Sequence, residues 1–172
     1  MREISRQIFI HGPYGMRQLK ETLSDLLIGL IMSPDDLWLV SPWVSDFDLL
    51  DNRSGNWDSI EPAWGARYVR FSELLVAAIE SGCSLKYVTN RDQMNQRFYD
   101  QLVARLSSDR LILKHEKNSL HTKGLLCSSF FLSGSMNFTY SGTHRNDERI
   151  QLSIDPNAIA EAKIELESQY SW

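Results

Sequence analysis

A window of 28 residues, from position 121 to position 148, holds the side chains of this chain that are best suited to chemistry. It contains an imidazole, an ammonium group, a Gly-Ser turn with a nearby amide, and a carboxylate, in the order His121, Lys123, Gly134, Ser135, Asn137 and Glu148. An imidazole can act as a nucleophile, and cations and neutral donors can hold the oxygens of a phosphoryl group as charge develops on them. These residue types are what phosphoryl transfer through a phosphohistidine requires, without a metal ion.

The spacing of these residues favours one shared site. His121 and Lys123 are two residues apart on a predicted strand, so their side chains point to the same face. A glycine then permits close approach of the backbone to a ligand, and Ser135 and Asn137 supply donors in the same turn. Glu148 comes at the start of the next predicted strand, where its carboxylate can bind a ring nitrogen of the histidine.

Alternating strands and helices must position this window. Short apolar runs predict strands over residues 7–10, 37–40, 85–89, 111–114, 122–127, 130–132 and 149–154. Helical periodicity and capping signals predict helices over residues 16–31, 71–79, 92–106 and 157–170. Residues 11–13 are predicted as a turn, and residues 45–65, which are acidic and rich in Asn, Ser and Gly, as a long loop. The alternation indicates a layered α/β fold in a single domain over residues 1–172.

Composition indicates a folded, soluble protein. The chain has 172 residues, of which 42% are hydrophobic, and this is enough for a sizeable core. No apolar run approaches the roughly 20 residues that cross a bilayer, and the N-terminus lacks the apolar segment of a signal peptide. Cys83 and Cys127 have no close-spaced pattern, which is typical of reduced thiols. We therefore expect a cytoplasmic protein that does not act at a membrane.

The net charge of −4 hides an uneven distribution. Residues 105–149 carry seven Lys or Arg against four acids, a net charge of +3, and include the reactive window. Residues 35–61 carry seven acids against one Arg. The basic segment suits an anionic substrate, although solvated faces explain the pattern equally well. The acidic segment is a candidate for a lid over the basic cleft or for a surface that binds a basic partner protein.

The window resembles the signature of the phospholipase D superfamily. That signature is His-x-Lys, an Asp four residues further on, a Gly-Ser pair, and then an Asn and an acid downstream. The matching residues here are His121, Lys123, Gly134, Ser135, Asn137 and Glu148. Ser41-Pro42-Trp43, after an early apolar strand, is similar to the end of the first strand in that family. The resemblance implies a layered α/β/α sandwich around a mixed β-sheet.

One position departs from the family pattern. Ser128 stands where the family has the Asp of its motif, and the following turn is about one residue shorter. In the family this Asp is mostly a structural group near a turn, so we expect activity to survive. The departure keeps a second hypothesis open, in which the chain is an inactive member that binds nucleic acid or scaffolds a larger complex.

The resemblance implies a role for each residue, and the residue types support it. His121 attacks phosphorus, and Glu148 accepts a hydrogen bond from the other ring nitrogen. Lys123, Asn137 and Ser135 hold the nonbridging oxygens. A second histidine must protonate the leaving oxygen. Because the window occurs once, a second copy of the chain must supply that histidine, and we predict a homodimer with the site at its twofold interface.

Other patterns are weaker. His115, His121 and Cys127 fit no common zinc spacing, and we expect neither a metal ion nor another cofactor. The His11-Gly-Pro-Tyr-Gly sequence before a helix lacks the Lys of a phosphate-binding loop and is read as an ordinary turn. Trp43 and Arg145 are candidates for substrate contacts, through base stacking and phosphate binding respectively, although packing or a solvated loop explains them as well.

Three functional hypotheses follow. The first is a metal-independent phosphodiesterase, a nuclease that acts on DNA or RNA through a phosphohistidine on His121. In the family, small bacterial members of this kind often serve in restriction or phage-defence systems with partner proteins. The second keeps the chemistry and changes the substrate to a phospholipid or a small phosphodiester. The third is the non-catalytic nucleic-acid-binding or scaffold protein.

Overall fold

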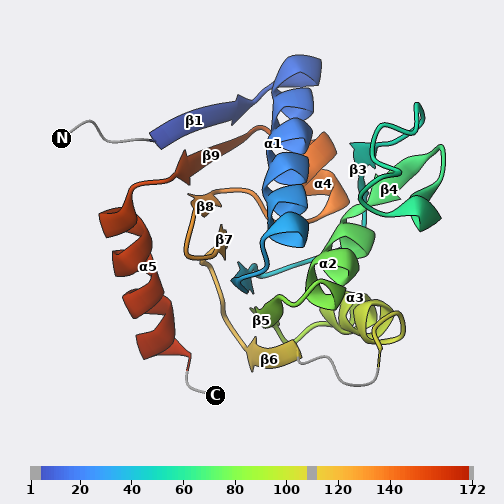
Figure 1. Ribbon diagram of the computed structural model, residues 1–172. Coiled ribbons are helices and arrows are strands. Elements are labelled where there is room, and N and C mark those ends of the chain that lie inside the picture. Colours follow the sequence, from blue (N-terminus) through green and yellow to red (C-terminus); the bar gives the residue numbers. More distant parts are fainter. Residues whose placement is uncertain (1–4, 108–111, 171–172) are drawn as a thin grey trace.

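A seven-stranded mixed sheet forms the centre of the molecule (Figure 1). The structure is a computed structural model that describes residues 5–107 and 112–170. The strand order is β1-β9-β8-β7-β2-β5-β6, in which β2, β5 and β6 are parallel and the other neighbours antiparallel. The strands are β1 (Ser5–Ile10), β2 (Asp36–Val40), β5 (Ser84–Asn90), β6 (Ile112–Lys117), β7 (Gly124–Leu126), β8 (Phe131–Gly134) and β9 (Glu148–Ser153).

One face of the sheet packs against three helices. These are α1 (Gly12–Met32), α2 (Phe71–Glu80) and α3 (Gln93–Val103), and Figure 1 shows them on the same side of the sheet. The apolar positions of α1 recur every three or four residues, so Leu19, Leu23 and Leu27 all point inward and are fully buried. They share one core with Leu39 of β2 and Tyr87 of β5.

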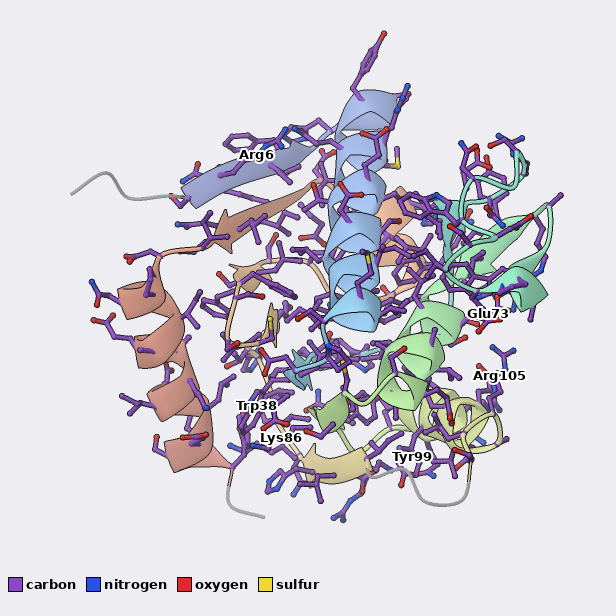
Figure 2. All side chains as sticks on the ribbon, in the orientation of Figure 1. Arg6, Trp38, Glu73, Lys86, Tyr99 and Arg105 are labelled. Carbon is purple, nitrogen blue, oxygen red and sulfur yellow. The ribbon has the colours of Figure 1, made fainter. Side chains whose placement is uncertain are left out.

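The opposite face packs against α5 (Pro156–Gln169). Successive side chains of a strand point to opposite faces, so Trp38 and Val40 of β2 lie on this side and form a second cluster with Ile159 and Leu166. Lys86, which pairs directly with Trp38, lies with its ammonium 4.6 Å from the indole ring (Figure 2). The result is a layered α/β fold around a mixed sheet, which confirms the fold class expected from the sequence.

The long loop predicted over residues 45–65 is wrong in part. The segment contains β3 (Asp48–Asp51), which pairs with β4 (Tyr68–Arg70), and a short 3-10 helix, η1 (Pro62–Trp64). Between them the buried side chain of Asn52 accepts from the Trp57 N–H at 2.8 Å and donates to the Gly65 carbonyl at 2.8 Å. The segment therefore folds around a polar side chain, which leaves no hydrophobic periodicity to detect.

Several boundaries also differ from the prediction. Residues 12 and 13 belong to α1 and not to a turn, with a proline in its first turn. Gly15 lies where a Cβ would be 2.4 Å from the Phe9 carbonyl oxygen, so only glycine lets α1 approach β1 this closely. A short helix, α4 (Tyr140–His144), was not predicted. The predicted strand over 111–114 is found as β6, and its first residue lies outside the described residues.

Candidate active site

The sheet topology brings the reactive window to one edge. The parallel strands β2 and β5 end at Val40 and Asn90, and Val40 lies opposite Gly124, the first residue of the antiparallel β7. The end of β8 pairs with the start of β9, Gly134 opposite Ile150. The segment before β7, the turn after β8 and the start of β9 therefore meet at the edge where β2 and β5 end. These three places carry His121, Lys123, Ser135, Asn137 and Glu148.

The segment with His121 and Lys123 precedes β7 and is not part of it, which corrects the prediction of a strand from residue 122. Two of its backbone groups bond to side chains. Leu120 N–H donates to Asn90 Oδ1 at 2.7 Å, and Lys123 Nζ donates to the His121 carbonyl at 2.7 Å. The His121 ring is exposed, with Nε2 at 3.5 Å from Ser119 Oγ. The backbone around His121 is therefore fixed by hydrogen bonds, and its ring is accessible to solvent.

The turn after β8 depends on glycine. Gly134 has φ +153, and a Cβ there would lie 2.2 Å from the Arg149 carbonyl oxygen. The close approach lets Ser135 N–H donate to that same carbonyl at 3.0 Å, while Arg149 N–H donates to Ser135 Oγ at 3.0 Å. Ser135 Oγ in turn donates to a carboxylate oxygen of Glu148, and Asn146 Nδ2 donates to the other at 3.3 Å. Ser135 and Glu148 thus form one hydrogen-bonded unit.

The side chain of Asn137 lies against the end of β2. The hydroxyl of Ser41, which is fully buried, lies 3.4 Å from Asn137 Oδ1 and donates to the Trp43 carbonyl at 2.8 Å. The same hydroxyl accepts from Phe138 N–H at 3.3 Å. Trp43 keeps 44% of its surface exposed at this edge. Ser41 therefore joins the segment of Trp43, a candidate substrate contact, to the turn of Asn137.

Two asparagines that sequence reasoning missed hold these segments in place. Asn95 of α3 is fully buried, accepts from Val44 N–H at 2.7 Å and donates to the Pro42 carbonyl at 2.8 Å. It also donates to the carbonyl of Asn90 at 2.9 Å, and the Asn90 side chain holds the segment before His121. Asn90 could have been detected as a polar residue at the end of a buried strand. No such signal marks Asn95 in the sequence, because two of its three partners lie about 50 residues away.

The expected hydrogen bond between His121 and Glu148 is absent among the described residues, because the Glu148 oxygens bond to Ser135 and Asn146. Arg145, expected to contact phosphate, has its guanidinium 5.3 Å from the centroid of the Tyr140 ring. His144 stacks on the same ring at 4.3 Å, and burial followed by the charge of Lys20 lowers its pKa. The topology thus brings the main residues to one edge without joining them into a closed network.

Position 128 has a carboxylate partner from elsewhere in the chain. Asp35, in the connection between α1 and β2, accepts from the Ser128 N–H at 2.7 Å and also from the Ser128 hydroxyl. Partial burial raises the pKa of Asp35, but the hydrogen bonds from Ser128 and from the Asp36 N–H outweigh it, so the pKa lies below its ordinary value. The turn after β7 is therefore held by a carboxylate although its own sequence lacks one.

Within the described ranges, no group of three or more His, Cys, Asp or Glu side chains is arranged to hold a metal ion. In the same part of the chain, no helix is both long and apolar enough to cross a membrane.

The sequence matches a known family. The family model described as "Cardiolipin synthase, PLD-like domain" matches residues 65–170, well over half of the chain, and this range includes the whole window from His121 to Glu148. The chain therefore belongs to this phospholipase D-like family, which confirms the resemblance seen in its motif. A comparison with curated proteins finds no match.

Solved structures agree in fold. Nuc, a phospholipase D family member from Salmonella typhimurium, is 15% identical with a TM-score of 0.59, over 98% of this chain and 93% of its own. NucT from Helicobacter pylori is 13% identical with a TM-score of 0.55, over 95% and 94%. Phosphatidylserine synthase from Haemophilus influenzae is 11% identical with a TM-score of 0.58, over 96% of this chain and 36% of its own. At these identities the similarity concerns the fold alone.

Proposed function

We propose that this protein is a metal-independent phosphodiesterase, a nuclease that cleaves DNA or RNA through a phosphohistidine on His121. Its family consists generally of phosphodiesterases. One observation carries the proposal: three separate strand ends deliver the signature side chains to a single edge of the sheet, where the His121 ring is exposed to a ligand. We further propose that the whole chain acts as one domain.

The proposed reaction has two steps. A ring nitrogen of His121 forms a bond to phosphorus, and the bond from phosphorus to the leaving oxygen breaks as a second histidine gives that oxygen a proton. Water then attacks phosphorus, returns a proton to the second histidine and releases His121 with a phosphomonoester product. Lys123, Ser135 and Asn137 hold the nonbridging oxygens while negative charge develops on them.

In this scheme Glu148 must change partners. Its carboxylate bonds to Ser135 and Asn146 in the free protein. When a phosphodiester takes up the Ser135 hydroxyl, the carboxylate is released to accept from the His121 ring and stabilise the imidazolium. Substrate binding would then assemble the nucleophile and its partner in one movement, since catalytic hydrogen bonds often tighten only in the complex.

The second histidine is proposed to be His121 of another copy of the chain. The signature occurs once in the chain and so supplies one His121 per copy, and an isologous dimer brings two identical half-sites together on its twofold axis. The exposed rings of Trp43 and Tyr140, at 44% and 47%, lie in the neighbouring segments and suit an interface of this kind.

A nucleic acid is the substrate that charge favours. Residues 105–149, which include the site, carry a net charge of +3 within a chain of net charge −4. A polyanion is attracted to such a segment through many phosphates, whereas a small diester presents one. The proposed setting is a bacterial restriction or phage-defence system with partner proteins, and a plaque assay with and without His121→Ala tests it.

The name of the matching family supports a second candidate, which is a phospholipid phosphodiester as substrate. The same residues could transfer a phosphatidyl group through the same phosphohistidine. A choline-release or phosphatidyl-transfer assay with mixed micelles separates it from the first.

The direct test is cleavage of plasmid DNA, single-stranded DNA and RNA in the presence of EDTA, with wild type beside His121→Ala. We expect cleavage that resists EDTA and falls at least about a thousandfold in the variant, because the nucleophile is gone. His115→Gln is a matched control, since His115 lies on β6 against Tyr170. Equal rates for wild type and His121→Ala would contradict the proposal, and intact nucleic acid with salt-dependent binding would identify the non-catalytic alternative.

A further inference from the structure

An aromatic ring stands open on the outermost strand of the sheet. Phe9 of β1 is 52% exposed, whereas Ile8 and Ile10 on either side of it are buried beneath α1. Phe9 therefore points to the face of the sheet opposite α1. On that face α5 packs on β7 and β8, and its buried cluster contains no residue of β1 among those described (Figure 1).

The neighbours of Phe9 on this face are cationic or polar. Arg149 pairs directly with Phe9 across β1 and β9, and its guanidinium lies 5.6 Å from the ring centroid. The ring of His11 stacks on Phe9 at 6.2 Å with an interplanar angle of 10°. Gln7 and Gln151 form the next pair on the same face, two positions along the register. We call these five residues, Phe9, Arg149, His11, Gln7 and Gln151, the β1 platform.

The charge of the β1 platform suits an anion. Among the described residues Arg149 makes no salt bridge, so its guanidinium is available to a ligand. Asp147 is the acid in contact with the platform, and it is paired with His11 Nδ1 at 3.2 Å. A shallow groove along the free edge of β1 is lined by Phe9 and Arg6. It is also lined by Arg17, whose guanidinium is paired with Glu21 of the same groove at 2.7 Å.

The platform is continuous with the candidate active site. Arg149 directly follows Glu148, and its backbone N–H and carbonyl both bond to Ser135. Three strand spacings separate β1 from β7, the strand that His121 precedes, which corresponds to about 14 Å. A polynucleotide whose phosphate lies at His121 would reach Phe9 within a few nucleotides.

We propose that the β1 platform binds single-stranded nucleic acid, with an unpaired base stacked on Phe9 and a backbone phosphate on Arg149. This inference rests on the proposed function and adds the form of its substrate. An exposed aromatic ring on an open sheet face, flanked by amides and by a guanidinium that forms no salt bridge with a described residue, matches the way in which proteins bind single strands through stacking and charge. A duplex has its bases paired and stacked, and so cannot use the ring.

The test measures binding by fluorescence anisotropy of labelled dT20, rU20 and a 20-base-pair duplex, with every protein carrying His121→Ala so that nothing is cleaved. Phe9→Ala is expected to weaken single-strand binding roughly 5- to 160-fold, as for a lost base–aromatic stack, and Phe9→Trp to retain it. Arg149→Gln is expected to lower the slope of the logarithm of the binding constant against the logarithm of the salt concentration by the amount that one phosphate contact contributes. Comparing the affinities for dT20 and rU20 shows whether the protein prefers single-stranded DNA or single-stranded RNA.

A matched control exists on β4. Arg53 lies 4.6 Å from the ring centroid of Tyr68, which is 39% exposed, so the same pairing of guanidinium and ring occurs there away from the site. Tyr68→Ala should bind single strands as tightly as the parent. If Phe9→Ala also binds as tightly, the proposal is overturned. If Phe9→Ala changes the mass of the free protein in sedimentation, the platform belongs to a second copy of the chain, and the proposal is overturned equally.

Hydrolysis of bis(p-nitrophenyl) phosphate separates this proposal from the proposed function. The substrate is too small to reach Phe9, so Phe9→Ala with an intact His121 should hydrolyse it at the parental rate. Absence of hydrolysis by the otherwise unmodified protein would count against the phosphodiesterase, whereas the binding comparison would still decide for or against the platform.

Discussion

The polar side chains at the two ends of strand β2, which form opposite edges of the central sheet, make different kinds of contact. At the edge where β2 begins, Asp35 takes both donors of Ser128, and Asp36 accepts from the Ser84 hydroxyl. At the edge where β2 ends, the exposed His121 ring has one contact with the described residues, at 3.5 Å. The first edge bonds its polar side chains to each other within the chain. The second fixes backbone positions and leaves the His121 ring accessible to a ligand.

The comparison predicts which substitutions should change the stability of the fold and which should change activity. At the edge where β2 begins, the contacts join segments far apart in sequence, so their loss should lower stability. At the edge where β2 ends, the side chains of His121 and Glu148 bond to residues at most 13 positions away in sequence, so their loss should lower activity and leave stability nearly unchanged. The predictions below test this division.

Among the tests of this division, the largest effect is expected from Glu148→Gln. The amide can still accept from Ser135, so the fold should be unchanged, but it cannot stabilise an imidazolium on His121. We expect the rate of phosphodiester hydrolysis to fall at least about a hundredfold while the melting temperature stays within about 2 °C. Asp147→Asn is the matched control on the neighbouring, exposed acid and should hydrolyse a small diester at the parental rate. A fall in melting temperature without a fall in the rate of hydrolysis would mean that Glu148 serves stability and not activity, which would contradict the prediction.

A mixture of subunits tests whether the exposed edge is completed by a second copy. When wild type and His121→Ala are co-refolded in equal amounts, one quarter of randomly assorted dimers has two His121 rings. Activity should therefore be about one quarter of that of an equal amount of wild type, because each site needs both histidines. Half of the activity would mean that each chain acts alone, and a monomeric mass in sedimentation would exclude the shared site.

Asp35→Ala should give the opposite pattern. Removing the carboxylate removes two hydrogen bonds from Ser128, which is exposed and can bond to water instead, and we expect a loss of about 0.5–1.5 kcal/mol in the free energy of unfolding, with activity changed less than about threefold. Denaturant unfolding measures the loss. Asp36→Ala, which removes a single bond to Ser84, is the matched control and should cost less. The exchanged pair Asp35→Ser with Ser128→Asp should recover part of the stability.

The smallest effect concerns pH. The pKa of Asp35 in the folded protein lies below its ordinary value of 3.8, so the ionised carboxylate stabilises the fold above that value and the contribution is lost as the pH falls through the folded pKa. The difference in stability between wild type and Asp35→Asn should be constant from pH 7 to pH 5 and should narrow below about pH 4. Thermal melts across this range measure it, and a difference that widens in acid would contradict the assignment.

The sequence predicts the parts of this molecule that rest on local patterns. The apolar run at residues 37–40 indicates the buried β2, and the periodicity from Met16 indicates α1, because burial selects residue types at regular spacing. The signature residues identify the family for a similar reason, since their types and spacing stay together in one window.

The remainder rests on hydrogen bonds of single polar side chains, two of which join segments far apart in the sequence. Asn52 organises the acidic segment, Asn95 holds the Pro42–Val44 segment, and Asp35 reaches Ser128 from 93 residues away. Each of these contacts depends on the tertiary fold and produces no periodicity, so sequence patterns cannot reveal it. The same reason explains why 45–65 was predicted as a loop and why β7 was started two residues early.

The main chain and the side chain of Arg149 make separate sets of contacts. Its main chain ties β9 to the Gly134-Ser135 turn through two hydrogen bonds, and its side chain lies outside on Phe9. A mutation at this codon can therefore exchange the exposed group and keep both main-chain bonds. Related chains can thus differ in the group that they present beside the candidate active site at position 149 while the geometry of the turn stays the same.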